Sequence, residues 1–271
     1  MPINSDVLPA FKGESVMPTR IIKVGDNDVW VKRVQEWLCL RGFKINIDGG
    51  QPTGGFGPAT AEAVKQFQAK NQLPETSTVD VTTYQKLIEP LVQATTFVPE
   101  KVDLLGDAVV AVAQKHLAVH PIEVGGDNCG PWVRQYCKGF DGAPYAWCQG
   151  FASSVIEQTC MALGVVSPIP LVYDGQFSLY VPTVVNGSKQ VNRFVSGLAA
   201  NAGDLVHPGS FFFVRSNNAP YHIHVGIVVS VSGDRQTITT IEGNTNTDGS
   251  ANGWEVAKRI RRITSCDYGI I

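Results

Sequence analysis

The spacing of apolar residues changes once along this chain, shortly after Gly164, and the change limits the folds open to it. Up to Gly164, apolar residues recur at helical spacing, most clearly in VWVKRVQEWLCLRGF and CQGFASSVIEQTCMALG. Beyond Pro168, the segments SFFFVR, HIHVGIVVSV, QTITTIEG and WEVAKRIRRI alternate with a period of two and are rich in β-branched residues. Helices followed by an antiparallel sheet predict an α+β fold.

The composition excludes several classes of function. The 271 residues carry a net charge of -2 and are 44% hydrophobic, so the chain has enough apolar residues for a core but no basic surface for nucleic acid or an anionic membrane. The short cluster Arg259, Arg261 and Arg262 is expected to be a solvated strand face. The six cysteines show neither a CxxC pair nor a Cys/His spacing suited to zinc. We therefore predict no metal and no cofactor.

The first 95 residues divide into two segments. Residues 1–20 are polar and without pattern, as expected of a tail or linker, whereas residues 21–95 predict three helices, in VWVKRVQEWLCLRGF, PATAEAVKQFQAKNQL and, more weakly, DVTTYQKLIEPL. These runs, with IDG and FG between the first two, resemble the three-helix peptidoglycan-binding domain found beside many cell-wall hydrolases. The insertion Gly50–Gly54 departs from that family's pattern and borders the expected binding groove. A helical bundle that binds nothing is the alternative.

Cys148 follows Trp147 at the point where AWCQGF enters a predicted helix. A thiol on the first turn of a helix faces unpaired backbone N–H groups and the positive end of the helix dipole, which favour the thiolate. The same N–H groups are suited to hold an oxyanion during acyl transfer. Free cysteine is also among the most buried residue types. The helix alone therefore leaves both a nucleophile and core packing open.

A thiolate nucleophile needs a base, and two of the five histidines, His222 and His224, lie on one predicted strand, where a period of two points them to the same face. A hairpin centred on Gly233 places His224 opposite Glu242 and His222 opposite Asn244. A carboxylate opposite the imidazole accepts its N–H and fixes its tautomer, as the third group of a triad does. The register is a requirement, because a turn one residue shorter or longer moves Glu242 to the other face.

The segments AWCQGF, GDLVHPGSFFFV, HVGIVV and IEGNTN, in this order, resemble the CHAP domain, a papain-like α+β fold of cysteine- and histidine-dependent amidases and peptidases that act on peptidoglycan. The resemblance covers residues 103–271, and residues 96–102 are the expected linker. It implies that Cys148 is the nucleophile, His224 the general base, Glu242 the residue that orients it and Asn244 a polar residue beside the triad. Their neighbours are expected to contact the substrate: Trp147, Gln149 and His222.

The predicted function is hydrolysis of an amide bond of the cell wall by a Cys-His-Glu mechanism. The two resemblances leave open an N-acetylmuramoyl-L-alanine amidase and a peptide endopeptidase, and two settings, a phage endolysin and an antibacterial effector injected into rival bacteria. The alternative is a non-catalytic wall-binding protein with an inactive papain-like domain.

The N-terminus lacks a basic patch followed by an apolar core, and no stretch approaches the apolar length of a membrane span. We expect synthesis in the cytoplasm without a signal peptide, and action on the wall after release or injection. The expected partner is bacterial peptidoglycan, joined in those settings by an immunity protein or a component of the delivery machinery. The chain is expected to be a monomer.

Overall fold

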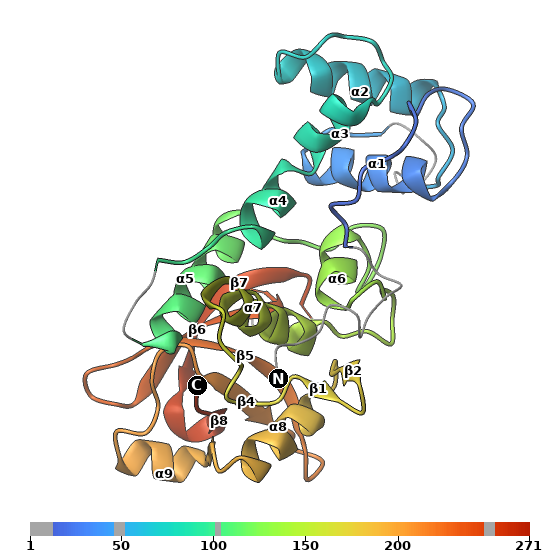
Figure 1. Cartoon of the computed structure of the whole chain (residues 1–271). Helices are drawn as coiled ribbons and strands as arrows, with labels where there is room; N and C mark the ends of the chain where they lie inside the picture. The colour runs from blue at the N-terminus through green and yellow to red at the C-terminus, as the bar shows by residue number, and fades with distance from the viewer. Residues whose placement is uncertain (1–12, 46–51, 101–103, 247–252) are drawn as a thin grey trace.

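The structure is a computed structural model and describes residues 13–45, 52–100, 104–246 and 253–271. Its N-terminal part is helical and lies at one end of the molecule (Figure 1). The third predicted helix is two short helices that meet at Ile88, because Pro90 in the first turn of the second cannot supply a backbone N–H to continue the first. The helices of this part are α1 (Val29–Leu40), α2 (Pro58–Lys70), α3 (Val81–Leu87) and α4 (Glu89–Thr95).

Two helices of the N-terminal part, α1 and α3, begin at side-chain caps. The Asp28 carboxylate accepts hydrogen bonds from the backbone N–H groups of Trp30 and Val31 at the start of α1. Asp80 accepts one from Thr83 at the start of α3.

The C-terminal part begins with helices and continues into a sheet (Figure 1). The helix predicted to start near Cys148 ends at Gly164, whose φ of 67° is the left-handed conformation that closes many helices. Two helices after Pro168 were not predicted, since VPTVVNGSKQ is rich in β-branched residues. In chain order the elements are α5 (Leu105–Ala118), α6 (Pro131–Tyr136), α7 (Cys148–Leu163), β1 (Val172–Tyr173), β2 (Gln176–Phe177), α8 (Val181–Gln190), β3 (Phe194–Val195), α9 (Gly197–Ala202), β4 (Phe211–Arg215), β5 (His222–Val231), β6 (Thr237–Thr245), β7 (Glu255–Arg262) and β8 (Cys266–Gly269).

The main sheet has the strand order β3-β8-β4-β5-β6-β7, and all of its pairings are antiparallel. Phe211 and Phe213 of β4 belong to the main core, which also contains residues of the helices, whereas Phe212 belongs to a smaller cluster with Tyr268. Both faces of the sheet are therefore covered. The prediction of an α+β fold with an N-terminal helical domain is confirmed.

The predicted register between β5 and β6 is wrong. Ile227 lies opposite Ile241, and the ladder shifts by one residue between Val228 and Ser230. The turn closes later than expected, around Arg235, which takes a left-handed φ of 56°. Near the site, each β5 residue therefore lies opposite a β6 residue that is two positions beyond the predicted partner. Because side chains alternate between the two faces, a shift of two residues keeps every side chain on its predicted face.

The two parts of the chain share a packed junction. The rings of Trp37 in α1 and Trp132 in α6 meet edge to face with centroids 5.9 Å apart. The amide of Gln158 in α7 donates to the backbone carbonyls of Ala94 and Phe97, at 2.8 and 3.0 Å. One continuous core cluster includes residues of both parts.

An ion-pair network lies at the same junction. The Arg134 guanidinium in α6 contacts carboxylates of Glu14, at 2.9 Å, Glu36, at 2.5 Å, and Asp141, at 2.8 Å. The Glu14 and Glu36 side chains are 0% and 1% exposed. Because buried carboxylates need a cationic partner, Arg134 ties two segments of the N-terminal part to α6.

Candidate active site

Cys148 is the first residue of α7, and Trp147 is the residue that precedes the helix. Its thiol is free, and the residue is 3% exposed. The backbone N–H groups of a first helical turn have no partner within the helix. The thiol therefore stands beside donors that are suited to stabilise negative charge.

His224 lies between the thiol and a carboxylate. Its Nε2 is 2.8 Å from Oε2 of Glu242, and its side chain also interacts with the Cys148 thiol. Burial lowers the pKa of His224, but the interactions with Cys148 and Glu242 outweigh burial and raise the pKa to about 9. The imidazole is therefore protonated at neutral pH. The structure brings together the three residues that the sequence predicts as nucleophile, base and orienting group.

Glu242 is fully buried and receives three donors besides His224. Nε and Nη2 of Arg261 donate to its two oxygens at 2.6 and 2.5 Å, and the Thr240 hydroxyl donates to Oε1 at 2.5 Å. Burial raises the pKa of Glu242, but Arg261 and His224 lower it to about 2. Glu242 is therefore a carboxylate across the physiological pH range.

Arg261 corrects the prediction of a solvated arginine face, since its side chain is 21% exposed and paired with Glu242. The sequence feature that could have indicated this pair is the place of Arg261 on β7, which pairs with the strand of Glu242. Residue spacing alone did not show that Arg261 is largely buried while its neighbour Arg262 is exposed.

His222 does not share a face with His224, contrary to the prediction. Val214 pairs with His224 but Arg215 with His222, so β5 carries an extra residue between the two histidines. The ring of His222 contacts Phe213, while that of His224 contacts Phe212. The bulge thus sends the two imidazoles to opposite faces.

The partner of His222 is also different from the predicted one. Its Nε2 is 2.8 Å from Oδ2 of Asp267, and Asp267 also accepts the backbone N–H of Gly197 at 2.9 Å. With 11% of its side chain exposed, His222 is held by Asp267, and the expected substrate contact is not supported.

Trp147 and Gln149 are buried, which corrects the expectation that they contact substrate. The indole N–H of Trp147 donates to Glu123 at 2.7 Å, and the Gln149 amide donates to Ser153 at 2.7 Å. Both side chains therefore pack in the protein interior and stabilise the start of α7.

Asn244 lies two residues after Glu242, on a distorted part of β6. The pairing of β6 with β7 shifts between Glu242 and Thr245, and Asn244 has a left-handed φ of 52°. The residue is 3% exposed, and its Oδ1 has no hydrogen-bond partner among the described residues. Just before it, Gly243 has no room for a side chain, because a Cβ there would lie 2.6 Å from Cβ of Phe151.

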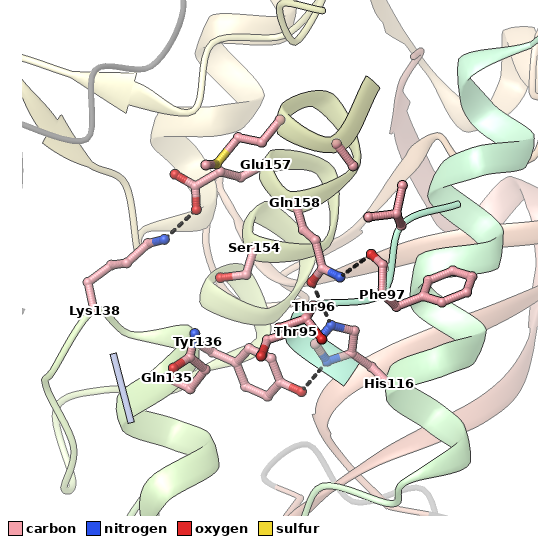
Figure 2. Close-up of a pocket in the computed structure, with 13 residues that line it drawn as sticks. Thr95, Thr96, Phe97, His116, Gln135, Tyr136, Lys138, Ser154, Glu157 and Gln158 are labelled. Carbon is pink, nitrogen blue, oxygen red and sulfur yellow. Dashed lines mark hydrogen bonds and ion pairs between the residues drawn. The ribbon is translucent and has the colours of Figure 1, made fainter. Parts of the chain in front are cut away.

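A cavity of about 250 Å³ lies against another face of α7, at the junction of the two parts (Figure 2). Several of its polar side chains bind one another. Lys138 pairs with Glu157, and His116 contacts the Tyr136 hydroxyl at 2.9 Å and Gln158 at 3.0 Å. Burial lowers the pKa of His116 to about 4, so this histidine is neutral at pH 7. The cavity includes neither the thiol nor the imidazole of the candidate active site.

The described residues contain no group of three or more His, Cys, Asp or Glu side chains arranged to hold a metal ion. Within the same ranges, no helix combines the length and apolar character needed to cross a membrane.

Comparison with known proteins concerns the N-terminal part. Residues 29–87 match a family model described as "Putative peptidoglycan binding domain". The match spans α1 to α3 and supports the predicted peptidoglycan-binding domain, with peptidoglycan as its partner. A solved structure titled "The crystal structure of SleB N-terminal domain" is 28% identical and covers 27% of this chain and 96% of its own, with a TM-score of 0.25. No curated protein matches the chain.

Proposed function

We propose that the protein is a cysteine-dependent peptidoglycan hydrolase that cleaves an amide bond of the wall. The observation that carries the proposal is the continuous chain from Cys148 through His224 to Glu242. A thiol at a helix start, an imidazole beside it and a buried carboxylate behind the imidazole are the three parts that nucleophilic amide hydrolysis requires.

In the proposed reaction, the Cys148 thiolate attacks the amide carbonyl and forms a tetrahedral intermediate. Backbone N–H groups at the start of α7 stabilise its oxyanion. The His224 imidazolium gives its proton to the leaving amine as the C–N bond breaks, which leaves a thioester. Neutral His224 then takes a proton from water, and the resulting hydroxide attacks the thioester. The Cys148 thiolate leaves, which restores the thiolate and the imidazolium, and the carboxylic acid product loses its proton to water. Glu242 holds the imidazole in place throughout.

The N-terminal part is proposed to bind the wall close to the bond that is cut. Binding at a second point raises the effective concentration of that bond at Cys148. The resemblance to CHAP domains supports either the bond between the lactyl group and L-alanine or a bond within the peptide. Action outside the cytoplasm, after release as an endolysin or injection as an effector, belongs to the same proposal.

The test is mass spectrometry of purified peptidoglycan after digestion with the unsubstituted protein, Cys148→Ala and Cys160→Ala. Cys160 is a buried thiol in the same helix and serves as the matched control. New amine ends with the unsubstituted protein and Cys160→Ala, but not with Cys148→Ala, are the expected result, and the fragment masses identify the bond. If all three proteins bind walls of several cross-link types and release nothing, the protein is a wall-binding protein without this activity.

A further inference from the structure

Arg261 contacts Glu242 in a geometry that fixes the carboxylate. Its Nε donates to Oε1 at 2.6 Å and its Nη2 to Oε2 at 2.5 Å, so both carboxylate oxygens are held by one planar group. Oε2 is also the atom that contacts His224, at 2.8 Å. The position of the imidazole therefore depends on a carboxylate whose rotation Arg261 prevents.

Arg261 also reaches His224 by a second route. Its guanidinium carbon lies 5.2 Å from the ring centre of Phe212, and the Phe212 ring centre lies 6.2 Å from that of His224. Two neighbours of the imidazole, Glu242 and Phe212, are therefore both in contact with Arg261.

The charged and titratable groups around this carboxylate come from four elements. Cys148 is on α7, His224 on β5, Arg261 on β7, and Cys266, whose thiol interacts with Arg261, on β8. A fully buried carboxylate is unfavourable unless it is paired. Without Arg261, His224 would be the remaining cation that faces Glu242 among these groups, and one proton shared between the two would leave both neutral.

We propose that Arg261 is a positioning residue that keeps Glu242 ionised and oriented, and thereby maintains the imidazolium beside Cys148 at neutral and mildly acidic pH. The inference rests on the proposed function of the thiol. It extends that function to a residue that touches neither the substrate nor the thiol. A salt bridge that only holds β6 to β7 would affect stability but not the pH at which the thiol becomes reactive.

The test is the rate of Cys148 alkylation by iodoacetamide as a function of pH, measured on the intact protein by mass spectrometry of the peptide that contains Cys148. Alkylation requires the thiolate but no wall substrate. The variants are Arg261→Met, Arg261→Lys and, as the matched control, Arg262→Met, which removes the same charge from an exposed position one residue away. Thermal unfolding of each variant shows whether it is folded.

Arg261→Met is expected to slow alkylation at pH 7 about tenfold and to move the acid limb of the profile up by about one pH unit. Arg261→Lys keeps the charge but loses the paired N–H donors of the guanidinium. Its alkylation rate at pH 7 is expected to lie between those of Arg261→Met and the unsubstituted protein. Arg262→Met should be unchanged. The inference is overturned if folded Arg261→Met and Arg261→Lys keep the original profile, or if their rates fall equally at every pH. If Cys148 of the unsubstituted protein reacts like an ordinary thiol, the proposed function itself fails.

Discussion

Nε2 of His224 and Oε2 of Glu242 lie 2.8 Å apart, although the two residues are not directly opposite in the sheet. Their strands pair with Ile227 opposite Ile241, so the imidazole and the carboxylate meet diagonally. Diagonal neighbours on one face are within reach of long side chains, and Glu242 spans this offset while Arg261 holds its other side. The two side chains can therefore meet in a register that is two residues from the predicted one.

Replacement of the two histidines should have different effects. His224→Ala removes the proposed base and is expected to lower hydrolysis by about 10²- to 10⁴-fold with the fold retained. His222→Ala removes a partner of Asp267 and is expected to lower the free energy of unfolding by about 1 kcal/mol with most activity retained. Release of amine ends and chemical denaturation measure the two effects. The opposite pattern would make His222 the base.

The pH dependence of stability should reveal the protonated His224. Its pKa rises from the ordinary 6.5 to about 9 in the folded protein. The stabilisation is therefore fully present below pH 6.5 and is lost as pH rises to 9, by an amount on the order of 3 kcal/mol. The difference in free energy of unfolding between the unsubstituted protein and His224→Ala, followed by denaturation from pH 6 to 10, should shrink over that window. A constant difference would contradict the protonated state.

Gly243→Ala tests the close contact between β6 and α7. The new Cβ would lie 2.6 Å from Cβ of Phe151 and 2.8 Å from Cζ3 of Trp147, so the start of α7 must move. We expect a loss of about 1–3 kcal/mol in the free energy of unfolding and slower alkylation of Cys148. Gly233→Ala, with no heavy atom within 4 Å of its Cβ, is the matched control and should change neither. Equal effects of the two substitutions would refute the close-contact explanation.

Arg134→Met should destabilise the whole protein. It leaves Glu14 and Glu36 buried without this partner, and we expect a loss of about 3–5 kcal/mol in denaturant unfolding. The control is Lys32→Met, whose ammonium is 47% exposed and 3.9 Å from Glu36, and which should change the free energy of unfolding by at most about 1 kcal/mol. Similar small effects of both would mean that the junction contributes little to stability.

Apolar spacing predicted most helices and the four longest strands, β4 to β7, and placed Cys148 at a helix start, because these features depend on residues close together in the sequence. The short strands β1, β2, β3 and β8 were missed. Apolar spacing also placed His224 and Glu242 on one face, since alternation specifies faces without specifying partners. The position of the turn near Arg235 and the bulge beside His222 were missed, because neither disturbs the hydrophobic pattern.

The supporting contacts of the site and the junction could not be predicted. Arg261 and Arg262 are adjacent and chemically identical, and only the pairing of β7 with β6 distinguishes the buried one from the exposed one. Arg134 meets Glu14 across a sequence separation of 120 residues, and no local pattern indicates such a pair. Trp147 and Gln149 were misassigned for a related reason, since proximity to a nucleophile in sequence does not say which side of the helix faces outward.

The junction at Trp37, Trp132 and Arg134 bears on how such proteins are engineered and diversify. Where two domains are joined only by a flexible linker, one wall-binding domain can be exchanged for another by cutting at the linker. Here an exchange that stops at residue 95 would leave Trp132 without the ring of Trp37 and Arg134 without two of its carboxylates. A functional chimera must therefore carry α6, or a surface matched to it, together with the helices that match the peptidoglycan-binding family model.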